Sequence, residues 1–371
     1  MTRGVVDVEG LGALIALLCA DGYTVIGPVV RDGTVVPTPV TSLSEMARGV
    51  VDHQGPGTYR LHADGDLLFG YAAAATGWKR YLFPAHRPLW RYDRNGSPTT
   101  AAQPIIRQAL FGVRSCDLHA LQVLDTVLAG RRYVDADYAA RRAATFVVAV
   151  TCAHPAATCF CASMSTGPAP QDGFDLLITE LVGERGHRFL VESGTPLGRA
   201  VLERLPAAPA TPGDDADVAT CVSASVATME RVVDTEGIRD LLYASANSPR
   251  WDDVAARCLS CTNCTLVCPT CFCFTTEDVV GLSGADGRDR MWDSCFNADH
   301  SLLHGGAVRR STRARYRQWV THKFGSWIDQ FGVSGCVGCG RCIAWCPAGI
   351  DVTEELAAIR AAAEQTAEDA P

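Results

Sequence analysis

Two runs of four cysteines, each ending in Cys-Pro, most constrain what this 371-residue chain can fold into. Both runs have the spacing C-x2-C-x2-C-x3-C-P, which is typical of bacterial two-cluster ferredoxins. In that pattern, three thiolates on a tight loop hold one 4Fe-4S cluster, and the fourth binds the neighbouring cluster. We therefore predict a cluster A on Cys258, Cys261, Cys264 and Cys346. We predict a cluster B on Cys336, Cys339, Cys342 and Cys268.

Zinc is the alternative metal, because C-x2-C pairs also bind zinc. Zinc sites rarely use two complete four-cysteine runs that each end in Cys-Pro, so we favour iron–sulfur clusters. Four thiolates on each cluster leave no coordination position for a substrate, which indicates electron transfer rather than catalysis. We also expect Gly338 and Gly340 to let backbone N–H groups approach the sulfurs of cluster B.

The placement of the cysteines predicts a reduced, metal-binding protein. Eleven of the 17 cysteines lie between Cys258 and Cys346, whereas disulfide scaffolds are short and spread their cysteines along the chain. The apolar run Leu11–Ala20 is brief and follows acidic residues, unlike a signal peptide, and no run approaches the roughly 18 apolar residues of a membrane span. The net charge of −8 argues against general nucleic-acid binding. We expect a cytoplasmic protein with neither membrane nor nucleic acid as partner.

Hydrophobic patterning predicts an α+β protein in two parts. Residues 1–250 are expected to form an α/β domain, and residues 251–371 a mainly helical ferredoxin-like domain with a long insertion, Thr275–Gly335, between its two cysteine runs. Strands are predicted at Leu67–Tyr71, Leu110–Val113, Thr145–Thr151 and Phe174–Val182, with a turn at Gly183–Gly186 and a returning strand at Phe189–Glu192. Helices are predicted at Cys116–Leu128 and after Asp351, the second capped by Thr353, and Pro206–Asp217 is expected to be a surface loop.

A second group of cysteines lies in the first part, where predicted strands end. Its members are Cys116, Cys152, Cys159 and Cys161. They suit a third 4Fe-4S cluster, a zinc site, redox-active thiols or simple burial. Cys116 begins a predicted helix, a position that favours the thiolate. Cys271, Cys273 and Cys295 are rival ligands, while nearby His119 and His154 are expected to be structural.

An arginine-rich segment, Ala307–Phe324, lies between the two runs. It allows three interpretations: nucleic-acid binding with Tyr316 and Trp319 as stacking residues, a solvated helix face, or positive charge that offsets the anionic clusters. We favour the third. Neither a dinucleotide-binding nor a nucleotide-phosphate motif is found.

Several segments resemble the β subunit of cytosolic nickel–iron (NiFe) sulfhydrogenases and NAD(P)-linked hydrogenases. This 4Fe-4S dicluster family also contains the A subunit of anaerobic sulfite reductase. The matching segments are 111–121, 158–164, 264–273, 292–295 and 336–342. The resemblance extends from about Leu67 to Thr353, and Ser165 is a departure, because the family pattern has glycine there.

The resemblance implies a non-catalytic electron-transfer subunit of an oxidoreductase, an NAD(P)-dependent hydrogenase. It favours the third 4Fe-4S cluster at Cys116, Cys152, Cys159 and Cys161. The implied partners form a hetero-oligomer: a flavoprotein subunit that binds FAD and NAD(P), and the small and large hydrogenase subunits. The alternatives are the electron-delivering subunit of an anaerobic sulfite reductase and an iron–sulfur regulatory module that binds nucleic acid.

Overall fold

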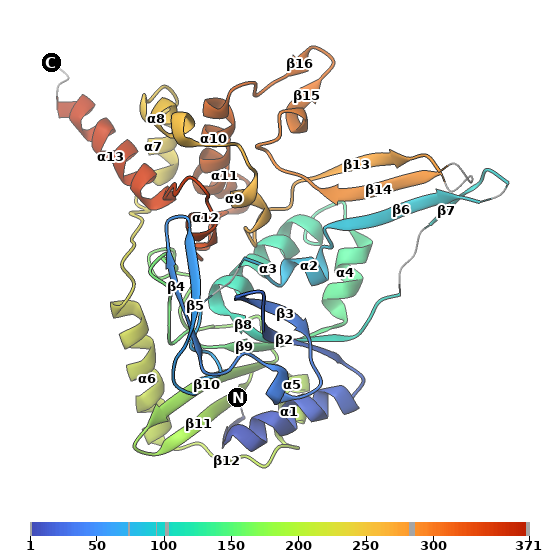
Figure 1. Cartoon of the computed structure of the whole chain (residues 1–371), viewed down its shortest axis with the longest axis vertical. Helices are drawn as coiled ribbons and strands as arrows, with labels where there is room; N and C mark the ends of the chain where they lie inside the picture. Colours follow the sequence, from blue (N-terminus) through green and yellow to red (C-terminus); the bar gives the residue numbers. More distant parts are fainter. Residues whose placement is uncertain (1, 73–74, 94, 101–103, 282–285, 369–371) are drawn as a thin grey trace.

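A large mixed sheet forms one end of the molecule. The computed structural model describes residues 2–72, 75–93, 95–100, 104–281 and 286–368, and within these ranges the sheet has the order β12-β1-β11-β10-β9-β8-β2-β3 (Figure 1). Its strands are β1 (Arg3–Val6), β2 (Thr24–Arg31), β3 (Thr34–Pro39), β8 (Gln108–Arg114), β9 (Thr145–Val150), β10 (Leu176–Gly183), β11 (Gly186–Ser193) and β12 (Ala208–Pro209). The neighbours β2, β8, β9 and β10 are parallel, and the outer pairings are antiparallel.

The parallel strands are apolar on both faces because helices cover both of them. On one face, α1 (Val8–Ala20) packs with Phe146 and Val148 of β9. On the other face, α3 (Ser115–Leu128) packs Leu118 against Val147 of β9. The predicted strands at 110–113 and 145–151, the hairpin at 174–192 and the helix at 116–128 are confirmed.

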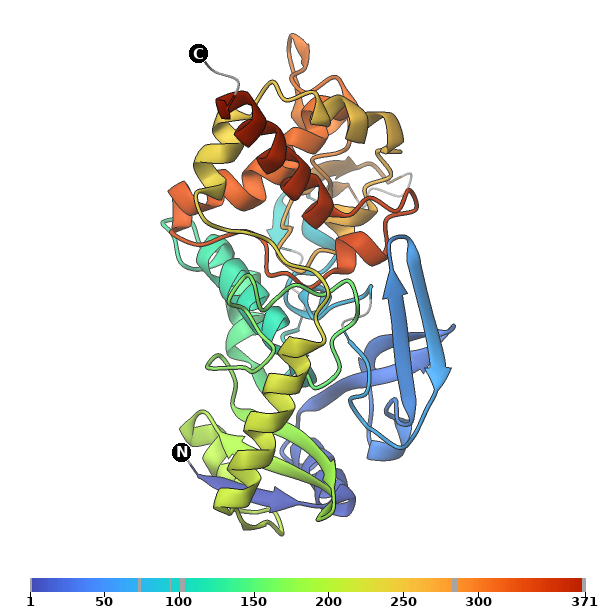
Figure 2. The same ribbon diagram turned by 90° about the vertical axis from the view of Figure 1, so that its left-hand side faces the viewer.

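Shorter elements surround this sheet. They are η1 (Leu43–Glu45), α2 (Lys79–Leu82), α4 (Ala136–Ala143), α5 (Pro196–Leu202), α6 (Pro212–Ala227) and the hairpin of β4 (Val50–Gly55) with β5 (Thr58–Ala63). The β4–β5 hairpin reaches the C-terminal helices (Figure 2). There, Gly57 N–H donates to the Ile343 carbonyl at 3.1 Å, and Tyr59 stacks on Trp345.

The C-terminal part combines helices with strands. Its helices are α7 (Ile238–Ala244), α8 (Arg250–Arg257), α9 (Asn263–Leu266), η2 (Asp299–Ser301), α10 (Thr312–Thr321), the π-helical turn η3 (His322–Ser326), α11 (Trp327–Phe331), α12 (Arg341–Ala344) and α13 (Val352–Glu368). Its strands are β13 (Phe274–Val279), β14 (Gly287–Trp292), β15 (Leu302–Leu303) and β16 (Gly306–Ala307). An aromatic core that includes Trp251, Tyr316 and Trp319 holds the helices together.

The inserted strands β13 and β14 join the two parts of the chain. They form a sheet of order β13-β14-β6-β7 with β6 (His86–Tyr92) and β7 (Pro98–Thr100) (Figure 1). Antiparallel pairing of β14 with β6 places residues 287–291 beside residues 86–91. The segments before and after residue 250 therefore share backbone hydrogen bonds.

Three sequence predictions of local structure are wrong. Leu67–Tyr71 is not a strand, because the N–H groups of Leu68 and Phe69 donate to the Glu180 carboxylate at 2.8 and 2.9 Å instead of to a neighbouring strand. Pro206–Asp217 is only partly a loop, since it contains β12 and the first turn of α6. The α13 cap is Asp351, whose carboxylate accepts from Thr353 N–H at 2.9 Å.

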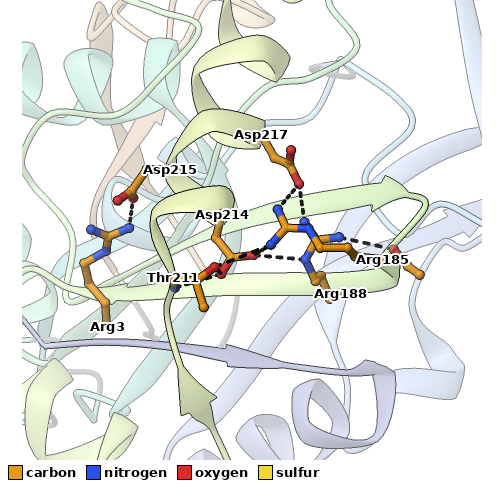
Figure 3. A network of polar contacts seen from close by, with 8 residues as sticks. Arg3, Arg185, Arg188, Thr211, Asp214, Asp215 and Asp217 are labelled. Atoms are coloured by element: carbon orange, nitrogen blue, oxygen red, sulfur yellow. Dashed lines mark hydrogen bonds and ion pairs between the residues drawn. The ribbon is translucent and has the colours of Figure 1, made fainter.

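Acidic residues at the start of α6 attach this helix to the sheet (Figure 3). Asp214 accepts from the backbone N–H and hydroxyl of Thr211, at 2.9 and 2.7 Å, in a capping box. It also pairs with Arg185 and Arg188 of the β10–β11 hairpin, at 3.0 and 3.1 Å. Asp217 pairs with the same two arginines, and Asp215 pairs with Arg3. At the far end of α6, the Ser225 hydroxyl donates to the Cys152 carbonyl at 2.6 Å. The helix therefore contacts the backbone of Cys152, a predicted ligand of the third cluster.

We expect Asp214→Ala to lower the free energy of unfolding by about 2 kcal/mol, because it removes the capping box and a buried partner of two arginines. Hydrogen bonds from Thr211 and the nearby arginines lower the pKa of Asp214 from 3.8 to about 2. The carboxylate therefore stabilises the fold fully above its unfolded pKa, and this contribution is lost as the pH falls from about 4 towards 2. Denaturant titrations at several pH values should show the difference from wild type shrinking over that interval. Asp215→Ala, at the exposed neighbouring pair, should cost less than about 1 kcal/mol; equal losses would contradict this prediction.

Candidate iron–sulfur centres

The four cysteines predicted for cluster A line one cavity. Cys258 ends α8, Cys264 lies in α9, Cys346 follows α12, and Cys261 lies on the intervening loop. Tyr316, Trp319 and Ile350 are among the residues that complete the apolar lining. The loop adopts left-handed backbone at Ser260 and Thr262, with φ of 51° and 71°, and Ser260 N–H donates to Cys258 Sγ at 3.4 Å. The sharply turned loop thus directs a backbone donor at a ligand sulfur.

The four cysteines predicted for cluster B line an adjacent cavity. They are Cys268, Cys336, Cys339 and Cys342, and the same lining includes Phe160, Lys323 and Phe324. Gly338 N–H donates to Cys336 Sγ at 3.5 Å, which agrees with the role expected for this glycine. Cys342 also lines the cavity of cluster A, so the two cavities are direct neighbours.

These cavities suit a polynuclear group with thiolate ligands. In the described residues, no three His, Cys, Asp or Glu side chains are arranged to hold a single metal ion. The cysteines instead surround enclosed spaces in two sets of four, with apolar neighbours and backbone donors directed at sulfur. That donor set fits 4Fe-4S clusters, which prefer soft thiolate ligands and hydrogen bonds to sulfur.

The N-terminal cysteines are buried together at the carboxyl edge of the parallel strands. Cys116 follows β8 and Cys152 follows β9, and because these strands are adjacent and parallel, both residues emerge at one edge of the sheet. The next loop carries Cys159 and Cys161, whose pKa values are raised by burial and by charge on the nearby Cys152. Burial raises the pKa of the Cys116 thiol well above its usual range. Burial thus opposes the thiolate form that the helix N-terminus is expected to favour.

A tight loop follows these cysteines. Ser165 has a φ of 56°, so the position where the family pattern has glycine does adopt left-handed backbone. Gly167 lies against Cys161, since a Cβ there would be 2.9 Å from Cys161 Sγ. The loop therefore places a serine in a backbone conformation that favours glycine.

The loop of cluster B packs directly against the N-terminal cysteine loop. Phe160 N–H donates to the Gly338 carbonyl at 2.8 Å, and the Thr166 hydroxyl donates to the Val337 carbonyl at 2.7 Å. Gly338 and Gly340 have φ of 62° and 72°, and an added Cβ would be 2.7 Å from the Cys161 backbone and 2.4 Å from the Thr158 carbonyl, respectively. These glycines permit a backbone-to-backbone contact that the sequence analysis did not foresee.

A buried ion pair joins the same two regions. Arg341 donates to both carboxylate oxygens of Asp117, at 2.8 and 2.9 Å, and both side chains are at most 3% exposed. Arg341 lies between Cys339 and Cys342, and Asp117 follows Cys116. The Asp117 carboxylate, in the first turn of α3, therefore bonds across the molecule.

The rival cysteines lie elsewhere, beside cluster B. Cys271 lies beside Cys268, and Cys273 lies beside Cys295 where β13 and β14 meet. Lys79 and Lys323 are buried around them. The sequence analysis did not single out either lysine, although they are the two lysines among 33 basic residues and Lys323 lies in the segment expected to offset the charge of the clusters.

Residues of the arginine-rich segment pack in the protein core and donate hydrogen bonds to backbone carbonyls of the same chain. Tyr316 and Trp319 are buried in the aromatic core and cannot stack on nucleic-acid bases. Arg315 donates to backbone carbonyls of residues 309 and 310, and Arg317 donates to the Ala246 carbonyl. These contacts disagree with both a nucleic-acid stacking platform and a fully solvated helix face.

Comparison with known proteins identifies the family. Residues 257–350 match a family model described as a 4Fe-4S dicluster domain. The chain is 31% identical over 334 residues to sulfhydrogenase 2 subunit beta of Pyrococcus furiosus, which covers 86% of this chain and 94% of the relative. The chain belongs to the sulfhydrogenase β-subunit family.

The resemblance recognised in the sequence is thus confirmed, and this sulfhydrogenase β-family protein is an iron–sulfur, electron-transfer protein of the hydrogenase type. No solved structure matches the chain. None of the helices that the structure describes is long and apolar enough to cross a membrane.

Proposed function

We propose that this protein is the iron–sulfur relay subunit of a cytoplasmic, NAD(P)-linked NiFe hydrogenase. It would carry electrons between a flavoprotein subunit that binds FAD and NAD(P) and the small subunit, which in turn serves the large subunit. The observation that carries the proposal is the pair of adjacent cavities lined by the two predicted sets of four cysteines, with Cys342 lining both cavities. The relative's name, which identifies it as one subunit of a sulfhydrogenase, supports a hetero-oligomer, and 17 free cysteines suit a reducing cytoplasm.

The loop contacts support an order for the relay, with cluster B between the third site and cluster A. The third site adjoins cluster B through Phe160 and Gly338, and Cys159 Sγ lies 3.9 Å from the Cys339 carbonyl. Cluster A adjoins cluster B through Cys342, and its ligand Cys261 is exposed at the surface. Bound clusters would supply one-electron storage, while the chain supplies thiolates, backbone donors and exclusion of water.

The cluster number is tested by the iron and sulfide content of the anaerobically purified chain. Three clusters predict about 12 iron and 12 sulfide per chain, and Cys159→Ala should reduce both to about 8. Cys221→Ala is a matched control, because Cys221 is a nearby, half-buried cysteine outside the predicted sets. If wild-type protein held about 8 iron and 8 sulfide per chain and Cys159→Ala left both unchanged, the third site would be disproved. Zinc in place of iron would disprove the electron-relay function.

The partners are tested by native, anaerobic purification from the source cells. We expect nickel and a flavin to co-elute with the chain. Sirohaem without nickel would overturn the hydrogenase assignment in favour of sulfite reduction.

A further inference from the structure

The two lysines of this chain surround one turn that carries a ligand of cluster B. Of 33 basic residues, 31 are arginines, and the two lysines are Lys79 and Lys323. Both are buried, with 6% and 5% exposure, and both contact the turn that begins at Cys268. Arginine cannot replace a compact ammonium with three separately directed donors, so this placement indicates a specific role.

Lys323 is held as a charged donor to the Cys268 sulfur. Its Nζ lies 3.1 Å from Cys268 Sγ, 2.9 Å from the Thr270 hydroxyl and 3.3 Å from the Gly335 carbonyl. Thr270 donates its own proton to the Gly335 carbonyl at 2.7 Å, so it accepts from Lys323. Three acceptors around one nitrogen require three N–H donors, which an ammonium provides and a neutral amine does not.

The backbone around Lys323 keeps the ammonium in place. Lys323 lies in the π-helical turn η3, and its carbonyl accepts from Gly335 N–H at 2.7 Å and from the Ser334 hydroxyl at 3.2 Å. Lys79 supports the same turn by donating to the Cys268 and Cys271 carbonyls, at 3.0 Å each, while it lies 4.0 Å from the centre of the Trp292 ring.

The corresponding sulfur contact at cluster A is neutral. There, Ser260 N–H donates to Cys258 Sγ at 3.4 Å. Reduction adds negative charge to a cluster and its sulfurs, and a nearby cation or a hydrogen bond to sulfur stabilises that charge, more strongly in a buried site than in water. The two cavities therefore differ in the charge of the donor that contacts a ligand sulfur, which is one of the properties that set the reduction potential.

We propose that Lys323 raises the reduction potential of cluster B through Cys268, so that cluster B accepts an electron before cluster A. Lys323 is a positioning and tuning residue rather than a catalytic one. The proposal rests on the proposed electron-relay function and adds that, of the two clusters on the cysteine runs, cluster B holds the electron more firmly.

The test is an anaerobic redox titration of the full-length chain, followed by electron paramagnetic resonance. Cys261→Ser and Cys336→Ser variants assign the signals of clusters A and B. In Lys323→Met, the midpoint potential of cluster B should fall while that of cluster A and the iron content stay at wild-type values. Lys323→Gln, which keeps a donor without the charge, should give a smaller fall and serves if the methionine variant does not fold.

The control is Arg317→Met, which removes a half-buried cation that donates a hydrogen bond to the Ala246 carbonyl. It should leave both potentials unchanged. An unchanged cluster B potential in iron-replete Lys323→Met and Lys323→Gln would overturn the tuning role alone. Wild-type protein without two reducible clusters would instead overturn the proposed function.

Discussion

Gly340→Ala is expected to lower the free energy of unfolding by about 4 kcal/mol and to deplete both cluster B and the third site. The new Cβ would lie 2.4 Å from the Thr158 carbonyl oxygen and 2.6 Å from its carbon, and neither backbone atom can move without displacing Cys159. Strain adds to this overlap, because Gly340 has a φ of 72°. Iron content per chain and the midpoint of chemical denaturation, both measured anaerobically, report the two effects.

A second glycine with the same φ provides a control that distinguishes steric overlap of the new Cβ from backbone strain. Gly33 has the same φ of 72°, but a Cβ there would meet nothing within 4 Å. Gly33→Ala should therefore cost only about 1 kcal/mol and keep the full iron content. If the two variants behaved alike, the close contact between the loops of Thr158 and Gly340 would be disproved.

Asp117→Asn is expected to destabilise the protein by about 3–5 kcal/mol, because it leaves the Arg341 guanidinium buried without this counter-charge. The carboxylate accepts two hydrogen bonds from Arg341 at 2.8 and 2.9 Å, and the pair connects the helix of Cys116 to the loop of Cys339. We also expect the iron of the third site to be lost before that of cluster A. Denaturant titration and iron content after mild chelation measure these two outcomes.

An exposed pair of similar geometry provides the control. Arg204 donates to both carboxylate oxygens of Asp21, at 2.8 and 3.0 Å, but the two side chains are 49% and 28% exposed. Asp21→Asn should cost at most about 1 kcal/mol. The double variant Asp117→Leu, Arg341→Met should recover part of the loss of Asp117→Asn, since no buried charge remains. No recovery, or an equal loss at Asp21, would contradict the role assigned to the buried pair.

Local patterns predicted much of the molecule because their causes are local. The parallel strands β8 and β9 are continuous apolar runs, and α3 repeats leucine at helical spacing, so each was found from neighbouring residues alone. Leu67–Tyr71 misled the same reasoning: the segment is buried like a strand, but the distant Glu180 carboxylate satisfies its backbone. A hydrogen-bond partner more than 100 residues away leaves no trace in the local pattern.

The sequence by itself predicted 4Fe-4S chemistry, because the spacing within each cysteine run places three thiolates on one turn of chain. It also indicated the family, through short motifs that the comparison with the Pyrococcus furiosus protein confirms. Only the tertiary structure decided which cysteine-bearing loops lie against one another. Gly340 against Thr158, Asp117 with Arg341, and Lys323 with Cys268 each join residues 55 or more positions apart. Such contacts depend on packing of whole elements, which spacing along the chain does not encode.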